Sequence, residues 1–205
     1  MRDDIKLGVS GDAGSFSEEA ALQYAQRIGI SPQLHYLIDM EGVLAAIETD
    51  KVDIGIFPVV NLNGGLVNMA FKAMGNHLFT PIDEIWLEIH QNLLALPGVT
   101  INQIQSIASH PQAFAQCRNF LEEEMDHAEI IHWQDTAKAA KDLSEGLLTP
   151  TTAVIAPECS APIYGLKVLK TNIQDRNPNL TAFILVKKHR KTEVFNEIKP
   201  GELWR

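Results

Sequence analysis

The sequence has few cysteines, no long apolar run and a deficit of positive charge. Two cysteines, Cys117 and Cys159, are too few for a disulfide scaffold, and the seven histidines show no metal-ligand spacing. No apolar run is long enough to cross a bilayer, and the charged start at residues 1–6 lacks the apolar region of a signal peptide. We therefore expect a cytoplasmic protein with no membrane partner and no metal.

Positive charge is also scarce. The 17 Lys and Arg residues against 26 Asp and Glu give a formal net charge of −9, which argues against a nucleic-acid partner. The glycine-containing turn at residues 11–14 has neither the spacing of a dinucleotide-binding fingerprint nor the lysine of a phosphate-binding loop. We therefore expect no cofactor.

Length and patterning indicate an α/β protein. The 205 residues, 45% of them hydrophobic, are enough for one large domain or two small lobes. Alternating strand-like and helix-like segments favour largely parallel sheets. The expected strands are 6–9, 33–37, 52–57, 84–95, 104–108, 129–133, 153–156, 166–169 and 180–187. The expected helices are 18–28, with Ser17 as N-cap, and 39–47, 67–74, 112–125, 136–145 and 160–164.

The stretch from Ser109 to Cys117 is the most informative part of the chain. An expected strand ends in Ser109 and His110, and Pro111 follows where a helix begins, a position that tolerates proline. A strand, a polar turn and a helix N-terminus together direct free N–H groups at one spot, which suits an anion. Taken alone, the stretch favours an ordinary helix cap.

Three further segments add a family resemblance. They are Gly11 to Ala21, Phe57 to Gly65, and the region from Tyr164 to Phe183 with its Asn-Ile-Gln-Asp and Asn-Leu-Thr-Ala-Phe blocks. In order and spacing, they and the Ser-His-Pro-Gln block resemble the catalytic domain of prephenate dehydratases over residues 7–186. The resemblance implies two α/β lobes around a cleft, as in periplasmic binding proteins. It places the first lobe at 1–82 plus 176–205 and the inserted second lobe at 83–175.

The resemblance also implies a set of site residues. Thr181 matches the threonine that assists departure of the ring hydroxyl, and Asn61 and Gln116 match the other catalytic positions. The implied substrate-binding residues are Ser15, Phe16, Ser109, His110, Gln112 and Phe183. Each has an ordinary structural role as well, such as a cap, a turn residue or a β-former. Only their joint occurrence in this order favours a site.

Three departures from the family pattern lie next to these residues. Val60, Leu62 and Ala182 stand where the family has glutamate, serine and arginine, so these positions have lost their polarity. We expect them to alter specificity, because a less polar wall would spare the ring hydroxyl. The chain also reaches Arg205 soon after the last expected strand, so we expect no ACT regulatory domain within it.

These departures favour a non-aromatising prephenate decarboxylase of a specialised pathway, such as antibiotic biosynthesis. That enzyme would release CO2 and keep the ring hydroxyl. Retention of Thr181 supports the alternative, a stand-alone prephenate dehydratase that forms phenylpyruvate. A third hypothesis is a catalytically inactive protein that binds a small anion in the cleft. The family resemblance leaves a homodimer open.

Overall fold

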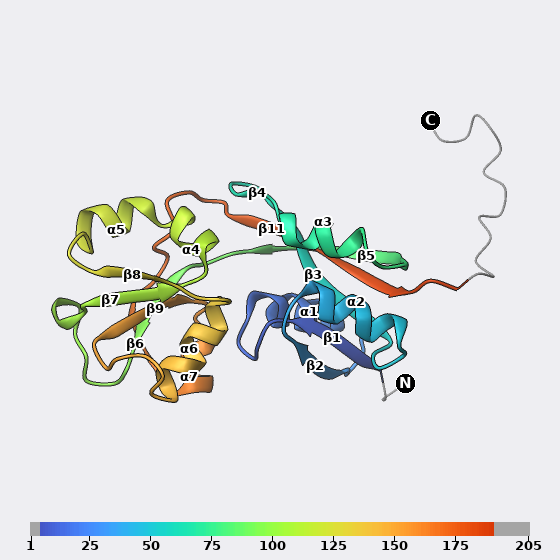
Figure 1. The fold of residues 1–205 in the computed structure, drawn as a ribbon, viewed down its shortest axis with the longest axis horizontal. Helices are drawn as coiled ribbons and strands as arrows, with labels where there is room; N and C mark the ends of the chain where they lie inside the picture. Colours follow the sequence, from blue (N-terminus) through green and yellow to red (C-terminus); the bar gives the residue numbers. More distant parts are fainter. Residues whose placement is uncertain (1–4, 191–205) are drawn as a thin grey trace.

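The computed structural model describes residues 5–190, which form two sheets lying side by side (Figure 1). The first sheet has the order β2-β1-β3-β11-β5, and β4 pairs with β3. Its strands are β1 (Lys6–Ser10), β2 (Gln33–Leu37), β3 (Ile54–Asn61), β4 (Gly65–Leu66), β5 (Phe79–Glu88) and β11 (Leu180–Lys188). Helix α1 (Phe16–Ile28) packs on one face, and α2 (Met40–Glu48) and α3 (Asn68–Met74) pack on the other.

The second sheet has the order β10-β6-β9-β7-β8. Its strands are β6 (Asn92–Ala95), β7 (Ser106–Ser109), β8 (Glu129–His132), β9 (Thr152–Ala156) and β10 (Lys167–Lys170). Its helices are α4 (Pro111–Gln116), α5 (Arg118–Glu124), α6 (Thr136–Ser144), α7 (Ser160–Tyr164) and the short 3-10 helix Ile101–Gln103. Both sheets are mixed, because β11 runs antiparallel to β3 and β5, and β6 runs antiparallel to β9 and β10.

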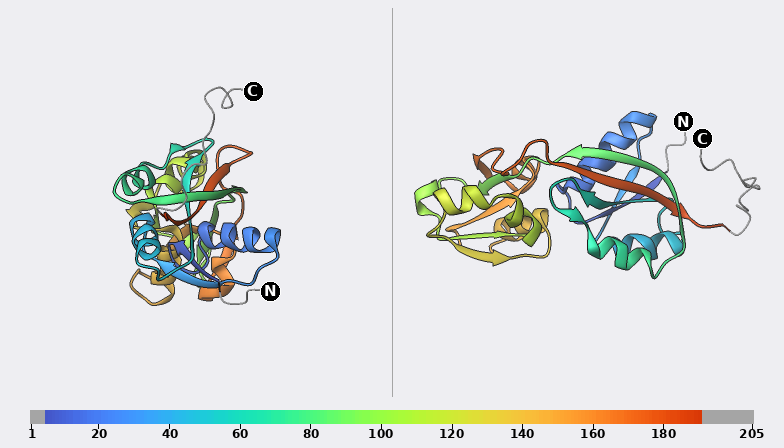
Figure 2. Two further views of the ribbon diagram at one scale, coloured as in Figure 1. Left: turned by 90° about the vertical axis from the view of Figure 1, so that its right-hand side faces the viewer. Right: turned by 90° about the horizontal axis from the view of Figure 1, so that it is seen from above.

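Two connections join the sheets. The chain leaves β5, passes through residues 89–91 into β6, and returns through residues 171–179 into β11 (Figure 2). Backbone hydrogen bonds hold the connections together, from Ile89 N–H to Asn179 O at 2.7 Å and from Ile173 N–H to Gln91 O at 2.9 Å. Residues on these connections therefore lie between the two sheets.

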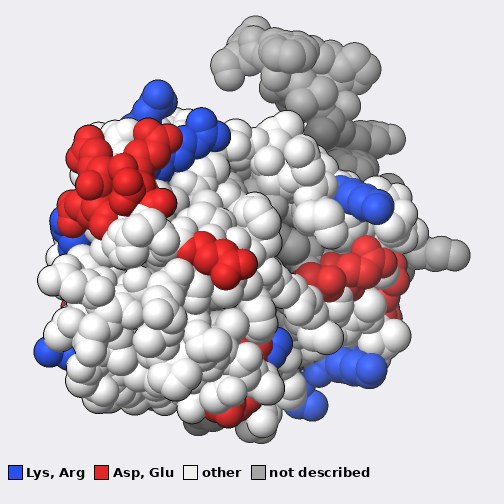
Figure 3. Space-filling view, turned by 60° about the vertical axis from the view of Figure 1, so that its left-hand side comes forward, with Lys and Arg blue, Asp and Glu red and all other residues white. Residues whose placement is uncertain are grey.

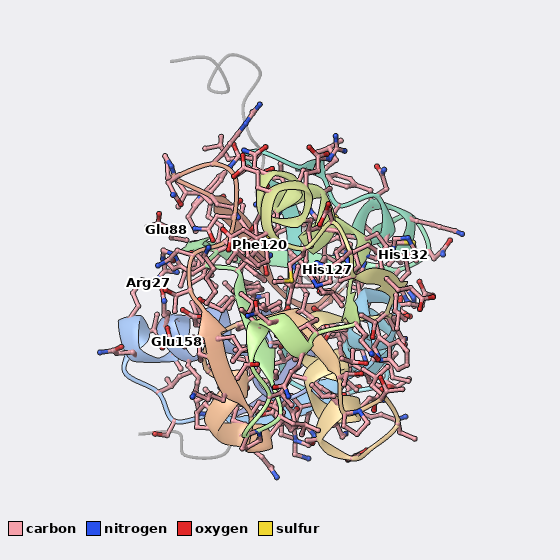
Figure 4. All side chains as sticks on the ribbon, turned by 90° about the vertical axis from the view of Figure 1, so that its left-hand side faces the viewer. Arg27, Glu88, Phe120, His127, His132 and Glu158 are labelled. Atoms are coloured by element: carbon pink, nitrogen blue, oxygen red, sulfur yellow. The ribbon has the colours of Figure 1, made fainter. Side chains whose placement is uncertain are left out.

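Two expected elements prove to be divided. The strand expected over 84–95 is β5 and β6, because the chain changes sheets at residues 89–91. The helix expected over 112–125 breaks at Cys117 into α4 and α5. There the Asp175 carboxylate accepts the backbone N–H groups of Arg118 at 3.1 Å and Asn119 at 3.0 Å, so a side chain from the return connection replaces the helical carbonyls. Figure 4 views this end of the molecule and shows Phe120 of α5 near its centre.

Two boundaries also differ from expectation. Ser15, not Ser17, caps α1, because Ser15 has extended dihedral angles and its Oγ accepts from Glu18 N–H at 3.3 Å. Ser17 is instead buried, 3.0 Å from Ser10 Oγ. Strand β3 continues through Pro58, since the register with β11 shifts between Pro58 and Val60. Proline is tolerated at such a bulge because a ladder hydrogen bond is already missing there.

The surface carries charge of both signs. On the face shown in Figure 3, acidic side chains form separate groups and basic side chains are scattered among them. Among residues 5–190, no helix has the length and hydropathy needed to cross a membrane.

A glycine in the central strand controls how closely α2 packs on the first sheet. A Cβ atom on Gly55 would lie 2.5 Å from Val43 Cγ1 and 2.9 Å from Ile47 Cδ1. Gly55→Ala is therefore expected to lower the free energy of unfolding by about 1–3 kcal/mol. Gly42→Ala, within α2 itself and with 3.6 Å to its nearest neighbour, is expected to raise it by about 0.5–1 kcal/mol. Denaturant unfolding of both variants checks the opposite signs, and equal effects would contradict this packing.

Candidate active site

A cleft of about 840 Å³ lies between the two sheets. Its lining comes from loops after β1 and β2, from loops after β7 and β8, and from both connections between the sheets. These loops follow the carboxyl ends of strands that run parallel to a neighbour. In open α/β sheets, ligands bind at such strand ends.

Four helices begin at this cleft. The first residues of α1, α2, α4 and α6 line it, with Ser15, Asp39, His110 and Asp135 as their N-caps. Each cap side chain accepts a backbone N–H of its own helix. The remaining N–H groups and the positive ends of the helix dipoles favour an anion.

The predicted site residues fall into three groups. Those lining the cleft are Ser15, Phe16, His110, Gln112, Gln116, Thr181 and Phe183. Two lie behind its wall: Asn61, which is 1% exposed, and Ser109, which is fully buried and donates to the Ile155 carbonyl at 2.6 Å. Ser109 therefore anchors β7 to β9 rather than facing a ligand. The third group, Val60, Leu62 and Ala182, is absent from the cleft wall.

Strand alternation explains why Val60 and Ala182 do not line the cleft. Thr181 and Phe183 point to the cleft side of β11, so Ala182 points to the opposite face, where it pairs with Val60 on one side and Trp86 on the other. Leu62 follows β3 and is 59% exposed. Because positions 60 and 182 are direct cross-strand neighbours, a glutamate and an arginine there would attract each other. Val60 and Ala182 are an uncharged pair, and neither lines the cleft.

Asn61 orients the hydroxyl of Thr181. Its Oδ1 accepts the backbone N–H groups of Asn63 at 2.9 Å and Gly64 at 2.6 Å, in the turn after β3. Its Nδ2 is therefore the donor that reaches Asn179 Oδ1 at 2.8 Å and Thr181 Oγ1 at 2.9 Å. Because Thr181 Oγ1 accepts from Asn61, its own proton is available to a group in the cleft.

The donor-to-acceptor direction set by Asn61 continues along a row of side-chain amides, which are Asn179, Gln116 and Gln91. Asn179 Nδ2 donates to Gln116 Oε1 at 3.0 Å and to the Ile89 carbonyl at 3.3 Å. Gln91 Nε2 also donates to Gln116 Oε1, at 3.0 Å. With its oxygen occupied by two donors, Gln116 keeps its Nε2 donor for the cleft that it lines.

Two arginines on the rim of the cleft were not among the predicted residues. Arg118 begins α5 and Arg176 lies on the return connection, and both line the cleft. Neither forms an ion pair with another of residues 5–190. The carboxylate of Asp175, next to Arg176 in sequence, accepts the backbone N–H groups of Arg118 and Asn119. Isolated arginines give no sequence pattern, so only the fold could bring these two to one rim.

The second sheet also holds the loop before α1. Tyr164 Oη donates to the Ala13 carbonyl at 2.6 Å, and Ser160 Oγ donates to the Gly14 carbonyl at 2.8 Å. Gly14 has a φ of 77°, and a Cβ there would lie 2.9 Å from Ser160 Oγ, so glycine suits this position for two reasons. These contacts connect α7 to Ser15 at the cleft. Within the described part of the chain, no three His, Cys, Asp or Glu side chains converge as a metal site.

Comparisons with known proteins match residues 7–191 to the family model described as prephenate dehydratase. The chain is 34% identical to the prephenate dehydratase of Lactococcus lactis subsp. lactis, over 97% of this chain and 68% of that protein. It is 32% identical to the bifunctional chorismate mutase/prephenate dehydratase of Buchnera aphidicola subsp. Schizaphis graminum, over 87% of this chain and 46% of that protein. The chain thus spans about half the length of several curated relatives.

Solved structures agree with this match. The prephenate dehydratase of Arthrobacter aurescens, solved with L-Phe, superposes with a TM-score of 0.76 at 27% identity, over 91% of this chain and 60% of that one. A periplasmic substrate-binding protein of an ABC transporter from Coxiella burnetii superposes with a TM-score of 0.52 at 18% identity, over 90% of this chain and 84% of that one. The second likeness shows the fold alone, and the predicted two-lobed α/β architecture is confirmed.

Two histidines give the stability opposite pH dependences. Burial lowers the pKa of His110, helped by His132 and opposed by Asp135. The unfolded chain therefore takes up more protons below about pH 6.5, and His110 contributes a loss of stability as the pH falls. The Glu48 carboxylate, 2.8 Å from the ring, raises the pKa of His77. The stabilisation that His77 contributes is therefore present at low pH and is lost as the pH rises.

We expect His110→Asn, which keeps a capping acceptor, to lose less stability than wild type between about pH 7.5 and about pH 5.5. We expect His77→Gln to lose more over the same interval. Melting temperatures of the three proteins at each pH check this, and parallel curves for all three would contradict it.

Proposed function

This chain belongs to the prephenate dehydratase family, and from that premise we propose that it converts prephenate into phenylpyruvate, CO2 and water. The bond from the ring to its carboxylate breaks, and its electron pair completes the aromatic ring. The ring hydroxyl leaves with its bonding pair and takes up a proton to become water. Hydroxide is a poor leaving group, so the enzyme must supply a hydrogen-bond or proton donor at that oxygen.

The observation that carries this proposal is the hydrogen bond from Asn61 Nδ2 to Thr181 Oγ1. It occupies an acceptor site of Thr181 and leaves the hydroxyl proton for the leaving oxygen. Thr181 is 7% exposed, which keeps competing water away from most of its surface. A donor held in this way costs little reorganisation when negative charge develops on the oxygen.

The proposed substrate carries two carboxylates, and the cleft offers helix N-termini and two arginines that can bind them. Helix N-termini of α1, α2, α4 and α6 begin along its walls, and Arg118 and Arg176 lie on its rim. The carboxylates of Asp39, Asp135 and Asp175 are each engaged by backbone N–H groups. An acidic protein can thus bind a dianion, because its charges are distributed unevenly.

Non-aromatising decarboxylation is the alternative reaction. Its support was a less polar cleft wall at positions 60, 62 and 182, and those side chains lie off the cleft. The favoured reaction is therefore dehydration with decarboxylation. The third hypothesis is a protein that binds a small anion without catalysis. It predicts that prephenate is bound but not converted, whereas both reactions consume it.

Incubation with prephenate at neutral pH is expected to yield phenylpyruvate, followed by its absorbance and mass. Thr181→Val keeps the β-branched shape and removes the hydroxyl, so kcat is expected to fall by about 10²–10³. Thr171→Val, at an exposed threonine outside the cleft lining, is the matched control. A product that retains the ring hydroxyl, or a loss below about tenfold in Thr181→Val, would contradict the proposal.

Asn61→Asp keeps the threonine and tests its orientation together with that of the amide row that begins at Asn61. The carboxylate still accepts the N–H groups of Asn63 and Gly64, so the turn is kept. It accepts rather than donates at Thr181, so the hydroxyl proton turns towards it and away from the cleft. We expect kcat to fall as far as in Thr181→Val, while Asn63→Asp, on the same turn, falls less. Unchanged kcat in Asn61→Asp would show that this hydrogen bond does not orient the donor.

A further inference from the structure

Gln91, a residue of the cleft lining, has one buried polar atom that finds no partner within residues 5–190. Gln91 lies on the outgoing connection, lines the cleft and is 3% exposed. Its backbone N–H donates to Gln174 Oε1 at 3.0 Å, its carbonyl accepts from Ile173, and its Nε2 donates to Gln116. Its Oε1 is buried and accepts from none of the residues 5–190.

Rotating the amide of Gln91 cannot satisfy this oxygen. Two backbone N–H groups fix Asn61 Oδ1, so Asn61 donates to Asn179, and Asn179 in turn donates to Gln116. Gln116 therefore presents its oxygen to Gln91 and requires a donor in return. An exchanged amide would place Gln91 Oε1 at the position of Nε2, 3.0 Å from Gln116 Oε1, so two oxygens would meet. The donor-to-acceptor direction along the amides thus determines that Oε1, rather than Nε2, is the atom of Gln91 without a partner within residues 5–190.

A buried acceptor without a donor is destabilising, which gives a ligand with a suitable donor an advantage over one without it. Donors that remain for a ligand at this cleft include Thr181 Oγ1–H, Gln116 Nε2, Arg118, Arg176 and helix N–H groups. The Asp39 and Asp135 carboxylates that also line it each already accept a helix N–H. The carboxylates and the ketone of prephenate accept only. Its single donor is the ring hydroxyl. The amino acid formed from prephenate by transamination has a second donor, an ammonium group, in place of the ketone.

We propose that Gln91 is a specificity-determining residue, whose Oε1 accepts a hydrogen bond from a donor group of the substrate. This rests on the proposed function for the identity of the substrate, but not on the outcome of the reaction. The donor is either the ring hydroxyl or the ammonium group of the amino-acid form. A site built to receive such a donor discriminates against analogues that lack it.

Four ligands separate the two donors. Prephenate has the ring hydroxyl, its amino-acid counterpart has both groups, phenylpyruvate has neither, and phenylalanine has the ammonium alone. Their dissociation constants are measured by calorimetry at neutral pH for Gln91→Met and its parent, both carrying Thr181→Val to slow turnover. Gln105→Met, at an exposed glutamine outside the cleft lining, is the matched control.

If Gln91 accepts from the ring hydroxyl, Gln91→Met weakens binding of prephenate and its amino-acid counterpart by about 5- to 50-fold and spares the other two ligands. If it accepts from the ammonium, binding of the amino-acid counterpart and phenylalanine weakens, and both keto acids are spared. An equal loss for all four ligands would show a structural role and overturn the proposal. So would a change below about twofold for every ligand.

Gln91→Asn withdraws the oxygen by one methylene and is used if Gln91→Met does not fold, with the same pattern expected. The proposed function fails independently, when wild type with Gln91 intact yields no phenylpyruvate. If Gln91→Met still weakened binding only of the ligands that carry one donor group, the role of Gln91 would be supported even in a protein without turnover.

Discussion

The orientation of one side-chain amide governs the polar wall of the cleft. Two backbone N–H groups in the turn after β3 fix the oxygen of Asn61 and make its nitrogen a donor. The proton of Thr181, the oxygen of Gln116 and the unpaired oxygen of Gln91 all take their direction from that choice. Buried polar networks act in this way because each member must match its neighbour in a medium where an unmatched group is costly.

This row of amides depends on both connections between the sheets. Gln91 lies on the outgoing connection and Asn179 on the return connection, and backbone hydrogen bonds hold the two together. Tyr164 and Ser160 of the second sheet also hold the loop that carries Ser15. A change in the relative position of the sheets would therefore alter the cleft from two sides, and the geometry of the site is coupled to lobe packing.

The electrostatics follow from the same architecture. Parallel strands bring several helix N-termini to one place, so N–H groups suited to an anion gather there within a protein of net charge −9. The acidic caps Asp39 and Asp135 are each engaged by an N–H group of their own helix. Arg118 and Arg176 add positive charge at the exposed rim, where solvent screens it.

Periodicity was sufficient to predict the α/β class. The resemblance of the motifs to a known family predicted the family and the residues Thr181, Gln116, His110 and Gln112, which line the cleft. Both were insufficient wherever a distant segment competes with local preference. Asp175 interrupts a helix that the local sequence would continue, and the alternation of β11 turns Ala182 away from the cleft that Thr181 faces. Arg118, Arg176 and Gln91 reach the lining of the cleft only through the fold. Local sequence specifies short-range periodicity, whereas the direction of a hydrogen bond and the sharing of a cavity depend on groups far apart in the chain.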